Sequence, residues 1–297
     1  MPWHKNLVYR LQMLPLRLLR AALRPLPDRW RGAIMAWLGR RVILNLPALR
    51  RRIEANLALV MPDRSAAERR HILIGNAGKI GRSMLDMLDS DRMVARADRY
   101  RINDTEGYRA LKAAHAEGRG VILIGAHYGR FDAARAALRA QDGIEIAAIY
   151  RPQNNPWFNA DLVKNFEKAG KPMFPRGRTG MRAMIRHLRS GGVAAVLIDQ
   201  RMATGEPLDF MGQPALTSTD IAELALRLDL PVIPGYTLRA GDGDDYVIDI
   251  EPPIPHTDPI TMTQALNDSL AARVRQDPTE WYWLHRRWRM DRRKTAD

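Results

Sequence analysis

From about residue 105 onward, short apolar runs alternate with segments of helical periodicity. The pattern predicts strands over 120–125, 144–150, 193–198, 231–237 and 245–251, with a short one near 172–174. It predicts helices over 106–117, 131–140, 156–169, 179–190, 218–228 and 260–276. This alternation indicates an α/β fold with a mixed, largely parallel sheet flanked by helices. We expect a loop over 199–217 and a hairpin turn at 241–245.

Composition narrows the classes of partner. The 297 residues include 47 Lys and Arg against 33 Asp and Glu, a formal charge of +14. Such a charge favours a polyanionic partner, either nucleic acid, an anionic lipid surface or an acidic protein. The absence of cysteine excludes disulfides, thiol catalysis and Cys-based metal sites, and is typical of a cytosol-facing protein. We expect neither a signal peptide nor a membrane span, because no apolar run approaches the ~18–20 residues that a span requires.

Residues 1–52 have a strong excess of basic residues, with Asp28 as the only acid. On a helical projection the arginines and the leucines of the first segment occupy separate arcs: Arg10, Arg17, Arg20 and Arg24 on one, Leu7, Leu11, Leu14 and Leu18 on the other. This pattern, together with Trp3, Trp30 and Trp37, predicts membrane-associating helices with leucines in the acyl region and arginines at lipid phosphates. A helix docked on its own protein with solvated arginines is the alternative.

We expect Pro15 to kink or restart the first helix. Residues 53–95 also read as helical, with Ser65 and Glu68 forming a capping box. The predicted organisation is therefore a basic amphipathic helical segment over 1–52 and an α/β domain over 53–297.

A histidine and an aspartate follow the first buried strand of the predicted sheet. The strand Val121–Ile124 leads into His127, and Asp132 lies five positions further on, where a helix is expected to begin. Catalytic groups of open α/β sheets sit at the carboxyl ends of strands. A neutral imidazole can take a proton from an alcohol, and a nearby carboxylate can fix its tautomer. We therefore predict an activated base at His127, oriented by Asp132.

Two further strands end in polar residues at the same predicted edge. Arg151 follows the strand that ends at Tyr150, where it is suited to bind a phosphate or an oxyanion, or is an ordinary surface arginine. Asp199 and Gln200 follow the next strand, and Asp199 either orients Arg151 or caps a loop. Arg176 and Arg178 are suited to a second anionic group, or begin a solvated helix.

Near the C-terminus, aromatic residues alternate with cations over 278–289. Stacking on nucleic acid, anchoring at a membrane interface and closure over the core are all compatible with this composition. No recognised nucleic-acid-binding motif accompanies it, so we expect lipid and not nucleic acid as the partner.

Taken together, these blocks resemble the late acyltransferases of lipid A biosynthesis, the lauroyl and myristoyl transferases with an H-x4-D/E motif. His127-Tyr-Gly-Arg-Phe-Asp132 matches the motif itself. Further agreement comes from Tyr150-Arg-Pro152, Leu197-Ile-Asp-Gln200, 210–217, 278–288 and 53–62. The likeness spans residues 50–290, and several motifs in the right order are hard to produce by accident.

The resemblance implies a glycerolipid-acyltransferase-like fold and acyl transfer to a hydroxyl of a lipid acceptor at the cytoplasmic face of the bacterial inner membrane. The implied donor is acyl carrier protein or acyl-CoA, and the implied acceptor is an anionic lipid A precursor. His127 is then the general base and Asp132 its orienting acid. Arg130, Arg151, Arg176, Arg178, Asp199 and Gln200 are expected to bind substrate. No cofactor, metal or covalent intermediate is expected.

The chain departs from this family within the motif itself. Arg130 replaces the usual Asn, Phe131 replaces Trp, and Asp132 replaces the Glu of the lipid A subgroup. An aminolipid or a lysophospholipid acceptor, or a non-enzymatic anionic-lipid-binding protein, therefore remains an alternative.

Overall fold

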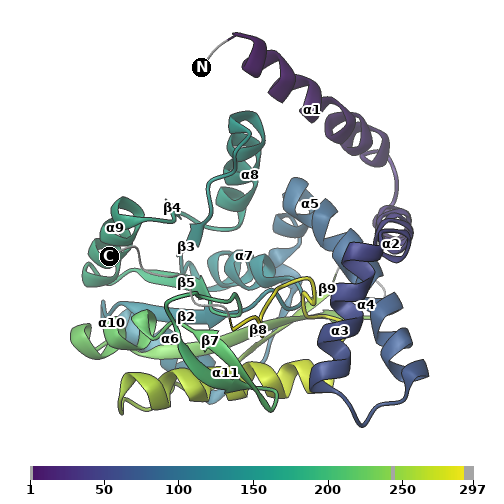
Figure 1. Cartoon of the computed structure of the whole chain (residues 1–297). Helices are drawn as coiled ribbons and strands as arrows, with labels where there is room; N and C mark the ends of the chain where they lie inside the picture. Colours follow the sequence, from purple (N-terminus) through teal and green to yellow (C-terminus); the bar gives the residue numbers. More distant parts are fainter. Residues whose placement is uncertain (1–2, 242–244, 291–297) are drawn as a thin grey trace.

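A seven-stranded mixed sheet forms the centre of the molecule in the computed structural model, which describes residues 3–241 and 245–290 (Figure 1). The strand order is β1-β9-β8-β2-β5-β3-β4. The bounds are β1 (Arg101–Ile102), β2 (Val121–Gly125), β3 (Ile146–Tyr150), β4 (Met173–Pro175), β5 (Val193–Leu197), β8 (Val232–Ala240) and β9 (Asp245–Ile250). All neighbours pair in parallel except β8 and β9, which confirms the predicted mixed, largely parallel sheet.

Helices cover both faces of this sheet (Figure 1). They are α6 (Glu106–Ala116), α7 (Phe131–Asp142), α8 (Pro156–Ala169), α9 (Arg178–Arg189), α10 (Asp220–Leu228) and α11 (Pro259–Gln276), close to the predicted ranges. The central strand shows why two layers form. Val121 and Leu123 of β2 pack in one buried cluster, and Ile122 and Ile124 pack in another. Successive side chains of a strand point to opposite faces, so an entirely apolar strand requires cover on both.

The segment 199–217 was expected to be a loop, and this prediction is wrong. It contains a hairpin of β6 (Glu206–Phe210) and β7 (Gln213–Thr217). Met211 and Gly212 form the turn, both with positive φ. The hairpin is held from outside, since the Trp288 indole donates to the Phe210 carbonyl at 3.0 Å. The central residues of the expected turn at 241–245 lie outside the described residues.

The N-terminal part of the chain is helical, as predicted. It comprises α1 (Trp3–Leu23), α2 (Asp28–Asn45), α3 (Pro47–Val60), α4 (Ala66–Leu88) and the short α5 (Asp91–Val94). The capping box of Ser65 and Glu68 is present at the start of α4. Pro15 lies within α1 without ending it, and residue 52, the predicted end of the first segment, lies inside α3. Among the helices of the described ranges, none is both long and apolar enough to span a membrane.

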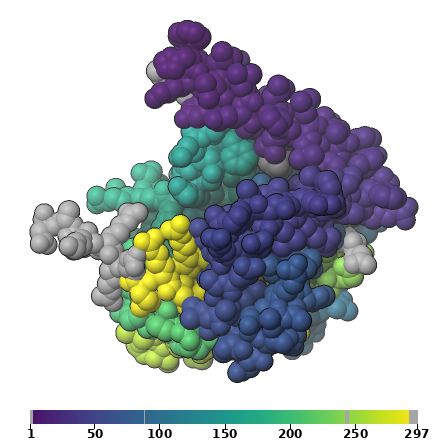
Figure 2. Space-filling view, turned by 45° about the vertical axis from the view of Figure 1, so that its right-hand side comes forward, coloured from purple at the N-terminus to yellow at the C-terminus, as the bar shows by residue number. Residues whose placement is uncertain are grey.

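Helix α1 presents its leucines outward. Leu7, Leu11, Leu14 and Leu18 are 50–61% exposed, and Figure 2 shows this helix along one edge of the surface. Its arginines have partners on the protein although they remain largely exposed. The Arg17 guanidinium lies 3.7 Å from the Asp161 carboxylate of α8, and Arg10 lies over the Trp157 ring at 4.6 Å. The structure therefore gives these arginines protein partners and leaves the apolar face uncovered by the described residues.

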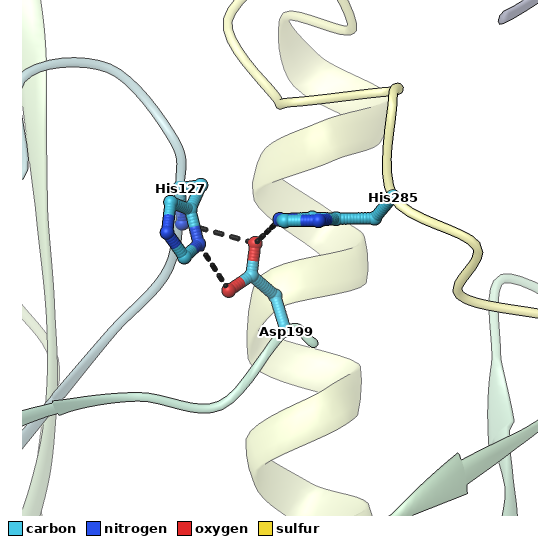
Figure 3. A group of neighbouring side chains, drawn as sticks. All are labelled: His127, Asp199 and His285. Atoms are coloured by element: carbon cyan, nitrogen blue, oxygen red, sulfur yellow. Dashed lines mark hydrogen bonds and ion pairs between the residues drawn. The ribbon is translucent and has the colours of Figure 1, made fainter. Parts of the chain in front are cut away.

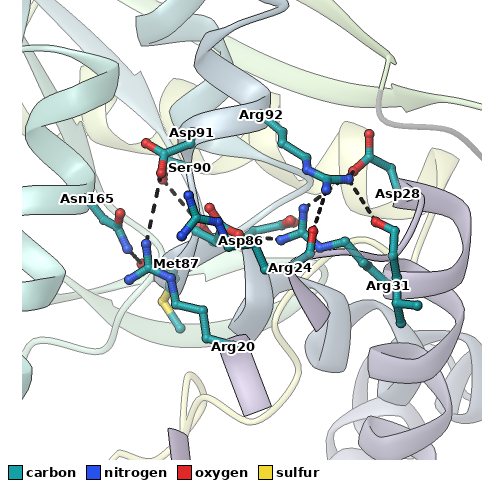
Figure 4. Close-up of polar contacts among 12 residues, drawn as sticks. Arg20, Arg24, Asp28, Arg31, Asp86, Met87, Ser90, Asp91, Arg92 and Asn165 are labelled. Carbon is teal, nitrogen blue, oxygen red and sulfur yellow. Dashed lines mark hydrogen bonds and ion pairs between the residues drawn. The ribbon is translucent and has the colours of Figure 1, made fainter. Parts of the chain in front are cut away.

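A cluster of ion pairs joins α2 to α4 and α5 (Figure 4). Arg31, only 4% exposed, pairs with Asp28 at 3.4 Å and with Asp89. Arg92 pairs with Asp28 and donates to the Arg24 carbonyl at 2.7 Å. Burial raises the pKa of Asp28, but hydrogen bonds and charge from Arg92 and Arg96 outweigh it, so the pKa lies below its ordinary value.

Replacing Arg31 with Met should lower the free energy of unfolding by about 3–5 kcal/mol, because Asp89 would be left in a buried position without its cation. Urea denaturation measures the loss. Arg29→Met is the matched control, because Arg29 is exposed on the same helix, and it should change stability by less than about 0.5 kcal/mol. Equal effects of the two substitutions would contradict a structural role for the buried pair.

Candidate active site

His127 lies in a tight loop between β2 and α7. Two glycines shape this loop: Gly125 ends β2, and Gly129 has a φ of +58°. A Cβ atom at position 129 would lie 1.9 Å from the Thr237 carbonyl oxygen, so only glycine fits there. The loop can therefore turn sharply into α7 and leave the His127 ring at the carboxyl edge of the sheet, as predicted.

Asp199 holds this histidine through two hydrogen bonds (Figure 3). The His127 Nδ1 atom lies 2.9 Å from Asp199 Oδ1, and the His127 backbone N–H donates to Oδ2 at 3.0 Å. The Trp281 indole N–H donates to Oδ2 as well, at 3.0 Å. Asp199 is fully buried and follows β5, the parallel neighbour of β2, which explains why two residues far apart in sequence meet.

The acid that orients His127 was expected to be Asp132, and the structure corrects this assignment. Asp132 lies in the first turn of α7, where its Oδ1 atom is 3.8 Å from Arg135 Nη1 and has no hydrogen-bond partner among the described residues. The reason is topological. The strand end beside His127 belongs to β5, so Asp199 occupies the Nδ1 position that Asp132 was expected to take.

The charges of the site place a titratable imidazole against a carboxylate that stays ionised. Burial lowers the pKa of His127, but the charge and hydrogen bond of Asp199, with Asp132 adding its charge, bring the pKa above its ordinary value. Burial raises the pKa of Asp199, yet His127 and His285 hold that pKa well below its usual range. Burial raises the pKa of Asp132 despite the nearby Arg135. Asp199 is therefore the permanently ionised member of the site.

His285 is a site residue that sequence reasoning missed. Its Nε2 atom lies 3.7 Å from Asp199 Oδ2, and its ring centroid is 4.9 Å from that of His127 (Figure 3). Burial lowers the pKa of His285 to about 4, so this imidazole is neutral near pH 7. His285 belongs to the aromatic segment near the C-terminus. The alternation of aromatic and basic residues drew attention to that segment, but did not single out this histidine.

The C-terminal aromatic segment closes over the core, which was one of the three alternatives. Trp281 and Trp283 are fully buried. The Tyr282 N–H donates to the His127 carbonyl at 2.9 Å, so the segment pairs directly with the motif loop. From the other side the Asn56 side-chain amide of α3 donates to the Trp283 carbonyl at 2.8 Å. The N-terminal helices and the C-terminal segment together therefore fix the loop that carries His127.

His127 and Asp132 line a cavity of about 540 Å³ between the sheet and helices α7, α8 and α9. Its walls are mainly apolar, with Leu123, Ile149, Leu162, Phe166, Met181 and Val196 among them. The exposed lining residues Arg151, Arg176 and Gln200 lie at the carboxyl ends of strands and mark the polar end. This volume is typical of a small-molecule site, and the lining suits an aliphatic chain with a charged group at one end.

Two predicted substrate-binding residues lie elsewhere. Arg130 is 6% exposed, pairs with Asp86 of α4 and donates to its carbonyl at 3.0 Å. Arg178 is exposed at the start of α9. Neither lines the cavity. Asp199 does not line it either, but it is hydrogen-bonded to His127, which does. The structure thus brings together five of the predicted residues around one space: His127, Asp132, Arg151, Arg176 and Gln200.

His127, Asp199 and His285 also form the one group of three or more residues in the described part of the chain whose possible metal-ligating atoms lie within 4.8 Å of one another. The His127 Nδ1 atom is already engaged with Asp199 at 2.9 Å. With Nδ1–H donating to the carboxylate, the opposite nitrogen Nε2 carries the lone pair of the neutral ring. The arrangement suits an oriented base better than a metal centre.

Replacing Asp199 with Asn should lower the pKa of His127, because the charge and hydrogen bond that favour the imidazolium are lost. His127 should then lose its proton at a lower pH than in the unmodified protein. Imidazole NMR titration measures both midpoints, and the His127→Gln variant identifies the signal. His285 should titrate near pH 4 in the unmodified protein. A His127 midpoint that is unchanged in Asp199→Asn would contradict the coupling.

Comparison with known proteins identifies the family of the chain. Residues 5–290 match the family model described as bacterial lipid A biosynthesis acyltransferase. The lipid A biosynthesis lauroyltransferase of Escherichia coli is 26% identical over 249 residues, which cover 80% of this chain and 78% of that protein. The lipid A biosynthesis myristoyltransferase of the same organism is 26% identical over 265 residues, covering 87% and 80%.

A third relative extends the comparison beyond lipid A. The phosphatidylinositol mannoside acyltransferase of Mycobacterium tuberculosis is 25% identical over 190 residues, which cover 62% of this chain and 60% of that protein. The family model, in contrast, covers nearly the whole chain. The chain therefore belongs to the bacterial lipid A biosynthesis acyltransferase family and is an acyltransferase.

Proposed function

We propose that this protein transfers a fatty acyl chain from a carrier thioester to a hydroxyl group of a lipid A precursor, with His127 as the general base. The observation that carries the proposal is the hydrogen bond from His127 to the buried Asp199, at the polar end of a largely apolar cavity. The names of the E. coli relatives support the class of acceptor.

The proposed reaction starts from the neutral form of the His127 imidazole, which forms as the pH rises through its pKa. Neutral His127 takes the hydroxyl proton at Nε2 while the hydroxyl oxygen attacks the thioester carbonyl carbon. Asp199 stabilises the imidazolium that forms, because its own pKa lies far below neutrality. The backbone N–H groups in the first turn of α7, next to His127, are suited to stabilise the oxyanion. The carbon–sulfur bond then breaks, and the imidazolium returns the proton to the leaving thiolate.

The roles of the neighbouring charges differ from the expected ones. Asp132 adds negative charge near His127 without hydrogen-bonding to it. Arg151 and Arg176, both exposed at the polar end of the cavity, are suited to hold phosphate groups of the donor or the acceptor. Arg130 supports the motif loop through Asp86. His285 packs against His127 and, with its lowered pKa of about 4, is uncharged near pH 7.

The apolar face of α1 supports association with a membrane surface. Trp3, Leu7, Leu11 and Leu18 of α1 and Trp30 and Trp37 of α2 are all more than half exposed. Leucine and tryptophan side chains of interfacial helices enter the boundary between lipid headgroups and acyl chains. We therefore infer that the protein lies on the cytoplasmic face of the bacterial inner membrane, where a lipid acceptor can reach the cavity.

His127→Ala should lower kcat by about 10²–10⁴-fold, the usual contribution of a general base. The assay supplies acyl carrier protein loaded with a fatty acid and a lipid A precursor, and product is detected by mass. The circular dichroism spectrum should remain that of a folded protein, whereas the melting temperature should fall, because the buried Asp199 keeps only the donors of the residue-127 backbone and the Trp281 indole. Unchanged turnover would refute the assignment of the base.

The same assay with other acceptors tests the alternatives. Product from an aminolipid or a lysophospholipid, but not from a lipid A precursor, would replace the proposed acceptor. Binding of anionic lipid without any product would indicate a non-enzymatic lipid-binding protein and contradict the proposed acyl transfer.

Changing Leu11 and Leu18 to Gln should weaken binding to phosphatidylglycerol vesicles at least about tenfold, because each leucine contributes up to ~1.5–3 kcal/mol when it leaves water. Cosedimentation with vesicles measures the change. Ile260→Gln is the control, because Ile260 is 52% exposed on α11, which lies on the opposite side of the molecule from α1 (Figure 1). Equal binding by the double variant and the control would exclude α1 as the membrane contact.

A further inference from the structure

Helix α9 has a row of four exposed arginines on a single face. Arg178, Arg182, Arg186 and Arg189 are separated by four, four and three residues, which places them within an arc of about 80°. The opposite face is buried, with Met184 and Leu188 in the core. We call these four residues the arginine row. At 1.5 Å per residue it runs for about 16 Å along the helix.

The arginine row has no acidic partner in the described part of the chain. Between Glu167 and Asp199 the sequence contains no Asp or Glu at all. The arginines of α1 differ in this respect, since Arg17 and Arg20 lie within 4.0 Å of carboxylates. Like charges four residues apart on a helix destabilise it by about 0.2–0.5 kcal/mol per pair. The repulsion along α9 is thus left uncompensated within the described structure.

The row begins beside the cavity. Arg176 and Gly177, directly before α9, and Met181 in its first turns all line the cavity. Figure 1 shows α9 at the edge of the molecule next to β4, with α8 between it and α1. A molecule bound along α9 would therefore lie close to the polar end of the cavity.

The chemistry of the surface favours a protein over a bilayer as its occupant. No large hydrophobic side chain is exposed on α9, whereas α1 and α2 carry a broad exposed apolar face. Interfacial membrane helices combine basic residues with an apolar face that enters the lipid. An exposed surface with charge alone is complementary to the folded surface of an acidic protein.

We propose that the arginine row is the docking surface for an acidic helix of the carrier protein that presents the acyl thioester. The inference rests on the proposed function, which supplies a carrier-bound donor. Docking on α9 places the carrier beside Arg176 and the cavity, so that the acyl chain enters the apolar space while the thioester stays near His127. Electrostatic complementarity of this kind raises the association rate and weakens with salt.

The test changes Arg182, Arg186 and Arg189 to Glu in the full-length protein and leaves Arg178 unaltered, since it was among the predicted substrate-binding residues. The matched control changes Arg70, Arg99 and Arg275 to Glu, three exposed arginines outside α9, and alters the net charge equally. Binding of fluorescent acyl carrier protein is measured by anisotropy at low and at high salt. Turnover is measured with acyl carrier protein and with a short acyl-pantetheine thioester.

We expect the α9 variant to bind the carrier protein at least about tenfold more weakly at low salt and to show a correspondingly higher KM for it. Turnover of acyl-pantetheine should stay within about twofold, which also shows that the site is folded. The control variant should retain its carrier affinity to within about threefold. Carrier binding that is equal in the two variants overturns the proposal.

Two further outcomes separate the alternatives. If the α9 variant keeps its carrier affinity but loses binding to phosphatidylglycerol vesicles, the arginine row binds lipid and the proposal is wrong. If the unmodified protein binds the carrier through α9 but turns over neither acyl carrier protein nor acyl-pantetheine, the docking surface is supported and the proposed reaction is contradicted. Carrier binding is measured directly, so the two conclusions do not depend on each other.

Discussion

The buried carboxylate of Asp199 is the interaction on which the site depends. It accepts hydrogen bonds from the His127 ring, the His127 backbone and the Trp281 indole, all between 2.9 and 3.0 Å. A buried anion is tolerated only when hydrogen-bonded partners compensate for lost hydration. The end of β5, the loop after β2 and the C-terminal segment therefore meet at the Asp199 carboxylate, so the position of the His127 ring depends on the assembly of the fold.

Contacts from other parts of the structure hold the segments around Asp199 in place. The C-terminal segment is secured by side-chain amides of the N-terminal helices, with Asn76 donating to the Thr279 carbonyl at 2.9 Å. Arg287, fully buried, donates to the Leu216 carbonyl at 3.0 Å and so fixes the hairpin. Outside this core lie two different surfaces, the apolar face of α1 and the arginine row of α9. The proposed lipid contact and the proposed carrier contact therefore lie on different helices.

The fold was largely predictable because its signals are local. An entirely apolar run such as Val121–Ile124 and the capping box of Ser65 are decided by neighbouring residues, and both are present as expected. The hairpin over 206–217 was not predictable in this way. Its strands contain Pro207 and Pro214, which weaken the strand signal, and its stability comes from distant contacts such as that of Trp288.

The sequence by itself determined which polar residue follows each strand: a histidine follows β2, an arginine follows β3 and an aspartate follows β5. All three lie at one edge of a parallel sheet. Only the tertiary structure decided which acid holds His127. Asp132 is five residues away in the first turn of α7, but the pairing of β5 with β2 brings Asp199 to the His127 Nδ1 atom. Spacing along the chain cannot reveal that choice, because it depends on which strands are neighbours and on the packing of the C-terminal segment against them.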